Sequence, residues 1–228
     1  MKLVLQQLPP GLRGPARQKL LAPDAAASLE SLEKDTDGLD YLDVYRDPVA
    51  CLLARRTRKG SQLPGYTSHG YGMSIDLDIK KILEERKISY ETLLYVLKKR
   101  GWFCHRRDGD PNGREAEHFN YLGDLGEKYL LRCTLDPTTW SRAAEERIYE
   151  KYGTHFQVDL PTCQRLLARA GFYTGEFTGT LDPYTREAVM AFQRAWDLVE
   201  DGTVGPTFCR VLVYITCEVE RLPARPAA

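Results

Sequence analysis

Neither sign of charge is in excess in this sequence of 228 residues, because 32 Lys and Arg residues balance 32 Asp and Glu residues. Nucleic-acid-binding domains usually carry a clustered basic excess, so we expect no nucleic-acid partner. No stretch approaches the roughly 18 uninterrupted apolar residues of a membrane-spanning helix, so membrane insertion is not expected. Hydrophobic residues make up 43% and charged residues 28% of the chain, which is typical of a folded globular protein.

Cysteine is sparse and scattered along the chain. The six cysteines contain no CxxC pair, so they are too few for a disulfide scaffold and wrongly spaced for a zinc knuckle. We expect mostly buried thiols made in a reducing compartment, although Cys163 could pair with Cys209 or Cys217 in a protein that works outside a cell. The N-terminus has only a short apolar patch, less than the about 7–15 residues of a signal-peptide core, so export by a signal peptide is not expected.

Turn signals and hydrophobic spacing divide the sequence into parts. An irregular lead-in is expected over residues 1–22, followed by an α+β domain over 23–145 with a small antiparallel sheet and flanking helices. A linker over 146–155 leads to a separate three-helix, all-α domain over 156–218. The Pro- and Ala-rich end, 219–228, is expected to be a frayed tail.

The elements within these domains follow from local patterns. Asp24 is expected to cap one helix, Pro48 to open another, and a helical stretch over 78–101 is expected to break near residues 88–89. Further helices are expected over 160–170, 183–196 and 206–219. The expected strands cover residues 41–45, 74–78, 118–122 and 128–135.

Histidine is scarce, and two of the four histidines stand in patterns that suit a metal site. His69 is followed by Asp76, with glycines between them that allow the chain to turn. The second pattern contains Glu115 and His118. A catalytic zinc ion needs three protein ligands and one open position for water. We therefore predict Zn as the cofactor, bound by two imidazoles and one carboxylate from His69, Asp76 and His118.

Glu115 is the candidate general base of this site. Positions three apart in an extended segment point to opposite faces, so a local bend is needed to aim Glu115 and His118 at one ion. With that bend, Glu115 would take a proton from the zinc-bound water and pass it to the leaving amine. His105 and His155 lack a partner at ligand spacing, and we expect them to be surface or packing residues.

A polar stretch between these motifs begins like a calcium loop. It offers side-chain oxygens at alternate positions from Asp108, Asp110 and Asn112. Phe119 stands where such a loop requires a bidentate Glu. A polar turn is therefore the favoured interpretation, and a weak calcium site beside the active centre is the alternative.

The pattern HxxGxxxD followed by ExxH resembles the D-alanyl-D-alanine carboxypeptidase family of zinc peptidases, which includes VanY-like enzymes and phage L-alanyl-D-glutamate endopeptidases. The family pattern, SxHxxGxAxD followed by ExWH, is matched at His69, Gly72, Asp76, Glu115 and His118. The chain departs from the pattern at Thr67, Ser74 and Glu117, where the family has Ser, Ala and Trp. The resemblance extends over residues 22–136.

The same family carries a Tyr-Arg-Ser segment upstream, whose arginine contacts the substrate and the oxyanion. The best match is at residues 45–47, and Arg55, Arg56 and Arg58 are competitors. The resemblance implies that Arg46 is the electrophilic partner that stabilises the tetrahedral oxyanion, an effect typically worth about 3–4 kcal/mol. A surface arginine in an ion pair at a strand end is the alternative interpretation.

Residues 156–214 resemble the three-helix peptidoglycan-binding domain. The matching positions include Gln164, Leu167, Gly171, Val189, Phe192, Gln193 and Gly202. The resemblance implies binding to the cell wall through exposed loop groups, because aromatic faces can stack on sugars. The candidates are Phe172, Tyr173, Asp182 and Tyr184, and packing is the alternative role for each of them.

Both resemblances imply one partner, bacterial peptidoglycan. Together they predict a zinc metallopeptidase of the L-alanyl-D-glutamate endopeptidase type, expected to be a monomer that its C-terminal domain tethers to the wall. The expected setting is a phage endolysin that accumulates in the host cytoplasm until a holin opens the membrane. The alternatives are a bacterial D,D-carboxypeptidase, a secreted effector acting on murein, and a non-catalytic wall-binding protein.

Overall fold

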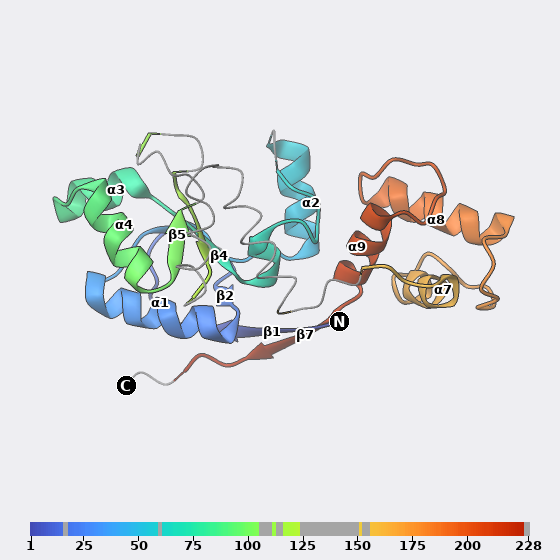
Figure 1. Ribbon diagram of the computed structural model, residues 1–228, viewed down its shortest axis with the longest axis horizontal. Coiled ribbons are helices and arrows are strands. Elements are labelled where there is room, and N and C mark those ends of the chain that lie inside the picture. The colour runs from blue at the N-terminus through green and yellow to red at the C-terminus, as the bar shows by residue number, and fades with distance from the viewer. Residues whose placement is uncertain are drawn as a thin grey trace. The chain divides into compact units, whose positions relative to one another are not determined.

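Figure 1 shows a computed structural model of the protein, whose described residues are 1–15, 18–58, 61–104, 111–112, 116–123, 151 and 156–225. The chain divides into two compact units. The helical unit combines Met1–Lys2, Asp47–Thr67 and Gly153–Glu218. The sheet unit consists of Leu3–Arg46, Ser68–Tyr152 and Val219–Ala228. Each unit therefore joins segments that are far apart in the sequence.

An antiparallel sheet of four strands forms the centre of the sheet unit, in the order β3-β4-β6-β5. The strands are β3 (Tyr41–Asp43), β4 (Ser74–Leu77), β5 (Trp102–Cys104) and β6 (His118–Tyr121). Asp76 lies opposite Asp43 on one side and opposite His118 on the other. The predicted strands at β3, β4 and β6 are confirmed, whereas β5 was not predicted, and the predicted strand 128–135 lies outside the described residues.

Three helices accompany this sheet, α1 (Pro23–Thr36), α3 (Ile79–Arg86) and α4 (Tyr90–Lys99). The predicted break near residues 88–89 is confirmed, because Lys87 adopts a left-handed conformation with φ of 52° and Ser89 caps the next helix by accepting a bond from Thr92 N. The prediction for Asp24 is wrong, since Ala22 is the N-cap of α1 and Asp24 lies in the first turn. An acidic residue there still stabilises the helix dipole.

The first 22 residues are not an irregular lead-in. They contain β1 (Lys2–Gln7) and β2 (Leu20–Leu21), which join β7 (Glu218–Leu222) in a sheet of order β2-β1-β7. Figure 1 shows β1 and β7 side by side, although they stand near opposite ends of the chain. Leu3 and Leu5 of β1 are fully buried. The predicted tail therefore begins as a strand, and local sequence patterns missed it because its partner is so distant.

The helical unit contains the three predicted C-terminal helices, α7 (Leu160–Arg169), α8 (Pro183–Ala195) and α9 (Pro206–Ile215). Local caps explain where two of them begin, because Asp159 and Asp182 each accept a bond from the backbone N–H three residues later. The third helix ends earlier than predicted, at Ile215, since β7 begins at Glu218.

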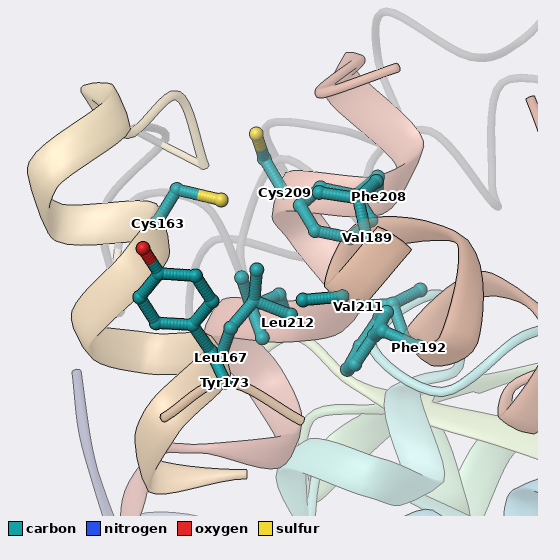
Figure 2. Packing of buried hydrophobic residues seen from close by; sticks show 10 residues of the cluster. Cys163, Leu167, Tyr173, Val189, Phe192, Phe208, Cys209, Val211 and Leu212 are labelled. Carbon is teal, nitrogen blue, oxygen red and sulfur yellow. The ribbon is translucent and has the colours of Figure 1, made fainter. Parts of the chain in front are cut away.

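Apolar side chains from all three helices meet in one core, which Figure 2 shows. Phe192 of α8 lies edge-on to Phe208 of α9, with ring centroids 5.1 Å apart. Leu167, Phe192 and Leu212 are fully buried. Burying one such side chain typically stabilises a fold by about 1.5–3 kcal/mol, so this core holds the helices together.

The helical unit also includes α2 (Pro48–Thr57) and the loop after it. Arg210 of α9 is 7% exposed, and its guanidinium lies 4.0 Å from the ring centroid of Tyr66. Its Nε donates to the carbonyl oxygen of Gly65 at 2.6 Å. Arg56 of α2 donates to both carboxylate oxygens of Asp197, at 2.9 and 2.8 Å. These contacts attach residues 47–67 to helices that follow them by more than a hundred positions.

The fold class is therefore α+β, as predicted, with a small antiparallel sheet, flanking helices and a helical C-terminal region. Across the part of the chain that the structure describes, no helix has both the length and the hydropathy to cross a bilayer. Most of the predicted linker over 146–155 lies outside the described residues, as do Asp108 and Asp110 of the calcium-like stretch.

Candidate metal centre

The structure brings His69, Asp76 and His118 together. His69 lies in a short 3-10 helix, η1 (Ser68–Tyr71), Asp76 in β4 and His118 in β6. Asp76 Oδ1 is 3.1 Å from His69 Nε2 and 2.8 Å from His118 Nδ1. The two ring nitrogens are 3.2 Å apart. One potential ligand atom from each side chain therefore faces the other two.

These distances suit a small metal ion. A tetrahedral ion with bonds of about 2.0–2.1 Å to nitrogen and oxygen separates its ligands by roughly 3.3 Å, slightly more than the separations seen here. The side chains of His69, Asp76 and His118 are 2%, 14% and 15% exposed. The cluster is thus mostly buried but still reached by solvent. Two imidazoles and a carboxylate form a donor set that fits zinc and related divalent ions.

The hydrogen bonds of His69 fix which of its ring nitrogens faces the cluster. Its Nδ1 lies 2.9 Å from the carbonyl oxygen of Val44. A carbonyl oxygen only accepts, so the proton of the neutral ring sits on Nδ1 and donates to Val44. The Nε2 lone pair then points toward Asp76 and His118 and is available to a metal.

Gly72 shapes the turn that carries His69. Its φ is 65°, and a Cβ atom here would lie 2.7 Å from Ala22 N and 2.9 Å from the carbonyl carbon of Leu21. Its own carbonyl oxygen accepts a bond from Ala22 N at 2.8 Å. Only glycine allows this left-handed, close approach without strain. The glycine that the sequence motif requires therefore has a packing reason.

Asp76 is charged in this environment. Burial raises the pKa of Asp76, but the imidazoles of His69 and His118 beside its carboxyl group lower it more, so this pKa lies well below its ordinary value. The carboxylate is therefore ionised at neutral pH, which is the state that a metal ion requires.

Arg46 lies beside the cluster, directly after β3. Its Nη2 is 3.3 Å from Asp76 Oδ2, and its Nε donates to Asp43 Oδ2 at 2.5 Å. The side chain is 16% exposed. The ion pair of the alternative interpretation therefore exists, although the side chain is mostly buried and not on the surface. It places the guanidinium beside the carboxylate of a candidate ligand. The electrophilic role of Arg46 stays a prediction. Among the competitors, Arg55 and Arg56 belong to α2 of the helical unit and Arg58 is its C-cap.

Glu115 lies outside the described residues, as do His105 and His155. The chain directly after Glu115 is well anchored. The hydroxyl of Tyr90 donates to Ala116 O at 3.1 Å, and Leu77 N of β4 donates to Glu117 O at 2.9 Å. The role of Glu115 as a general base stays a prediction.

The predicted wall-binding residues differ in their exposure. Tyr173 was expected to be an exposed loop group, but it is 4% exposed and belongs to the helical core, and its hydroxyl donates to Glu176 O at 2.7 Å. Phe172 is partly buried and contacts Phe192 edge-on, with ring centroids 5.4 Å apart. Both side chains pack in the fold because they extend the apolar face that the helices bury.

Asp182 and Tyr184 stand at the start of α8. Asp182 caps the helix by accepting a bond from Thr185 N at 2.7 Å, so the fold itself accounts for this residue. Tyr184 is 52% exposed. Phe177, which sequence reasoning missed, is 49% exposed and stacks on Tyr173, with ring centroids 6.3 Å apart. Tyr184 and Phe177 are thus the exposed aromatic residues here, and binding by Tyr184 stays a prediction.

Sequence reasoning also missed residues beside the cluster. Asp43 holds Arg46, and Asn120 lies 3.2 Å from the second ring nitrogen of His118. A usable signal existed for both. Asp43 precedes Arg46 by three positions, and Asn120 shares the strand face of His118 because alternate residues of a strand point to one side.

One protein family matches part of the helical unit. Residues 158–212 match the family described as "Putative peptidoglycan binding domain". This match agrees with the resemblance found at residues 156–214. The chain is also 33% identical over 79 residues to the N-acetylmuramoyl-L-alanine amidase CwlM of Mycobacterium tuberculosis (strain ATCC 25618 / H37Rv), over 34% of this chain and 20% of that protein. The chain thus spans about a fifth of the length of this curated relative.

Among solved structures, the chain is similar to the LdcB LD-carboxypeptidase, whose structure is described as revealing the molecular basis of peptidoglycan recognition. The TM-score is 0.43 and the sequence identity 12%, over 59% of this chain and 76% of that chain. This likeness is too weak to assign the fold.

Proposed function

We propose that this protein is a zinc-dependent murein peptidase that cuts the stem peptide of bacterial peptidoglycan, with the specificity of an L-alanyl-D-glutamate endopeptidase. The observation that carries the proposal is the convergence of His69, Asp76 and His118, with an arginine on the same carboxylate. The match of residues 158–212 to a peptidoglycan-binding family supports the choice of substrate.

The three side chains define how a metal would be held. His69 would bind through Nε2, His118 through Nδ1 and Asp76 through Oδ1, the atoms that face one another. Zinc at such a site lowers the pKa of a bound water molecule to about 7 and so supplies a nucleophile at neutral pH. Glu115 is proposed as the general base that accepts the proton of this water and returns it to the leaving amine.

Arg46 is proposed to stabilise the oxyanion that forms when water attacks the peptide carbonyl. Its guanidinium is a fork of N–H donors, and the contacts with Asp43 and Asp76 fix its orientation. An oriented donor costs little reorganisation when negative charge develops, which is why such groups are typically worth about 3–4 kcal/mol. Replacement of Arg46 by Ala should therefore lower kcat far more than it raises KM.

The helical unit is proposed to bind the wall and so raise the local concentration of stem peptide around the metal centre. Tyr184 and Phe177 offer exposed aromatic faces for sugars or peptide planes. A double replacement by Ala should weaken sedimentation with purified sacculi while leaving cleavage of a short soluble stem peptide unchanged. Replacement of exposed Tyr95 on α4 of the sheet unit is a matched control.

The decisive experiment is digestion of purified sacculi by the intact chain, with and without a chelator. We expect release of fragments that EDTA abolishes and zinc restores. Mass spectrometry distinguishes the bonds cut, because L-alanyl-D-glutamate cleavage, loss of terminal D-alanine and release of the whole peptide from the sugar yield different masses. The last outcome would assign instead the activity named for the amidase relative.

Two variants test the proposed roles of Glu115 as general base and of His118 as metal ligand. Glu115→Ala should bind zinc stoichiometrically and lose turnover, whereas His118→Ala should lose both. His155→Ala removes a histidine without a partner at ligand spacing and is the matched control, which should keep both. Full turnover by the Glu115 variant would refute its role as the base.

Binding without digestion would favour the rival function, a non-catalytic wall-binding protein. The match to a binding family favours this rival independently of the metal centre. Sedimentation with sacculi and fragment release, measured on one sample, separate the two functions. The endolysin setting is a further proposal. It predicts that induced expression in a Gram-negative host lyses cells only when a holin is expressed with it.

A further inference from the structure

His69 and His118 differ in what holds the ring nitrogen that faces away from the cluster. For His69 the partner is a backbone carbonyl oxygen, at Val44. For His118 it is a side chain, since His118 Nε2 lies 3.2 Å from Asn120 Oδ1. A substitution can remove the second partner but not the first.

Asn120 is fixed by its place in the sheet. It lies in β6 between β4 and β5, and its Cα pairs with those of Ser74 and Phe103. It is 5% exposed. Residues two apart in a strand share a face, so Asn120 and His118 project to the same side. A buried amide costs stability unless it is hydrogen-bonded, and the imidazole of His118 supplies that bond.

The chemistry of His118 requires an acceptor at this position. An imidazole that binds a metal through Nδ1 must carry its proton on Nε2, and that N–H then needs an acceptor. The hydroxyl of Ser68 also lies near Nε2, but at 3.5 Å it is beyond the usual hydrogen-bond distance. Asn120 Oδ1 is therefore the better-placed acceptor of these two.

The competing position of the proton explains why an acceptor matters. His118 Nδ1 lies 2.8 Å from the carboxyl oxygen Oδ1 of Asp76. In the metal-free protein, a proton on Nδ1 would donate to that carboxylate and block the atom that binds the metal. An acceptor at Nε2 stabilises the other tautomer, in which the proton lies on the far side of the ring and Nδ1 can bind a metal ion.

We propose that Asn120 is a positioning residue of the metal centre, which accepts the Nε2 proton of His118 and so selects the tautomer and ring orientation that bind the ion. This inference rests on the proposed metal centre and adds to it a residue that touches neither substrate nor metal. Removing such a partner typically costs roughly 10- to 100-fold in metal affinity.

Zinc affinity of the purified full chain, measured by competition with a chromophoric chelator, tests the proposal. Asn120→Ala should weaken zinc binding by roughly 10- to 100-fold. Asn120→Asp keeps an acceptor oxygen and should restore affinity to near the wild-type value. Ser68→Ala is the matched control and should change affinity by no more than about twofold, since its hydroxyl is poorly placed.

The ring protons can be observed directly by long-range proton–nitrogen NMR of the zinc-loaded wild-type protein. We expect His118 to be bound through Nδ1 and protonated on Nε2, and His69 to show the reverse. This readout does not depend on the folding of any variant. A His118 bound through Nε2 would overturn the proposal.

The remaining outcomes are also decisive. Wild-type affinity in folded Asn120→Ala, shown by an unchanged thermal transition, would overturn the inference, and so would equal losses in the Ala and Asp variants. If Asn120→Ala does not fold, Asn120→Asp and the wild-type NMR spectrum decide. Absence of zinc binding by the wild-type chain would instead refute the proposed function, so the two failures are distinguishable.

Discussion

The helical unit and the metal centre both bury polar side chains, but they recruit partners over different distances along the chain. Gln164 of α7 is fully buried, and its Nε2 donates to Thr185 Oγ1 at 2.9 Å while its Oε1 accepts from Gly179 N at 2.9 Å. Those partners are 21 and 15 positions away. Gln193 of α8 reaches only 9 positions forward, where its Oε1 accepts from Gly202 N at 2.9 Å.

The metal centre has one short connection and two long ones. His69 and Asp76 are 7 positions apart, but His118 is 42 from Asp76 and 49 from His69. Pairing of β4 with β6 sets this geometry, and a slip by one residue would turn His118 to the other face of the sheet. Gln164 and Gln193 thus bind loops that lie close to them because few residues separate them in the sequence. The metal centre, by contrast, forms only after strands that are distant in the sequence have paired.

Asp76→Ala should have the largest effect, and only in the sheet unit. The substitution removes one metal ligand and one ion-pair partner of Arg46. The binding free energy of zinc in a four-ligand site is typically about 10–16 kcal/mol, so the loss of one ligand should weaken zinc binding by at least roughly 100-fold. Chelator competition measures the loss. Amide exchange in α7 and α8 should be unchanged. Faster exchange there would contradict the independence of the two regions.

Phe192→Ala should have the opposite effect, because it should destabilise the helical unit and leave zinc binding unchanged. Removing a fully buried ring from the helical core is expected to cost about 3–5 kcal/mol of unfolding free energy for this unit. Hydrogen exchange of α7–α9 amides should report the loss, and zinc affinity should stay at the wild-type value. Exposed Val199→Ala is the matched control and should change exchange little.

Alkaline pH should destabilise the helical unit gradually. Burial, with a smaller contribution from Cys209, raises the pKa of the Cys163 thiol from 9.0 to about 12. A group whose pKa is raised by folding contributes stability below its unfolded pKa and loses it as pH rises through the folded one. Stability should therefore fall between pH 9 and about 12, by about 1.4 kcal/mol per pH unit at most.

The variant Cys163→Ala checks the source of this pH dependence. Protection of α7 amides, followed at several pH values, should fall less steeply in the variant than in the wild type. A wild-type chain whose protection is flat from pH 9 to 11 would contradict the prediction. Cys209 and Cys217 also have raised pKa values, so a residual slope is expected in the variant.

Ser74→Ala should have the smallest effect and tests whether the sheet unit tolerates change beside its site. Ser74 is fully buried in β4, and its hydroxyl has no hydrogen-bond partner within the described residues. Removing an unsatisfied hydroxyl is expected to be neutral or stabilising, by up to about 1 kcal/mol. Thermal unfolding measures this. A loss of more than about 1 kcal/mol would indicate a partner such as ordered water.

Sequence patterns predicted the helical unit best. The caps at Asp159 and Asp182 and the apolar spacing of α7 and α8 are local signals, so the helices and their starts are confirmed. The same reasoning wrongly predicted that Tyr173 is exposed. The sequence of a glycine-rich loop does not show whether an aromatic side chain points toward solvent or toward the core. It also missed the attachment of α2, since Arg210 and its partner Gly65 are 145 positions apart.

In the candidate site, the residue types were predictable and their arrangement was not. Spacing suggested His69, Asp76 and His118 as one ligand set, and the structure brings them together. The sheet that contains β1 and β7 escaped prediction, as did the contact of Asp43 with Arg46. Each of these features depends on which strands pair. Pairing between strands that are far apart in the sequence is not visible in the local composition of either strand.

The amino-acid sequence by itself determined which functional groups the site contains, namely two imidazoles, a carboxylate and a nearby arginine. It also determined where the capped helices begin. Only the tertiary structure decided that His69 presents Nε2 and His118 Nδ1, that Val44 and Asn120 stand behind them, and that residues 47–67 join the helical unit. The physical reason is that caps and periodicity act within a few turns of chain. The orientation of a ligand depends instead on partners that approach only when distant strands pair.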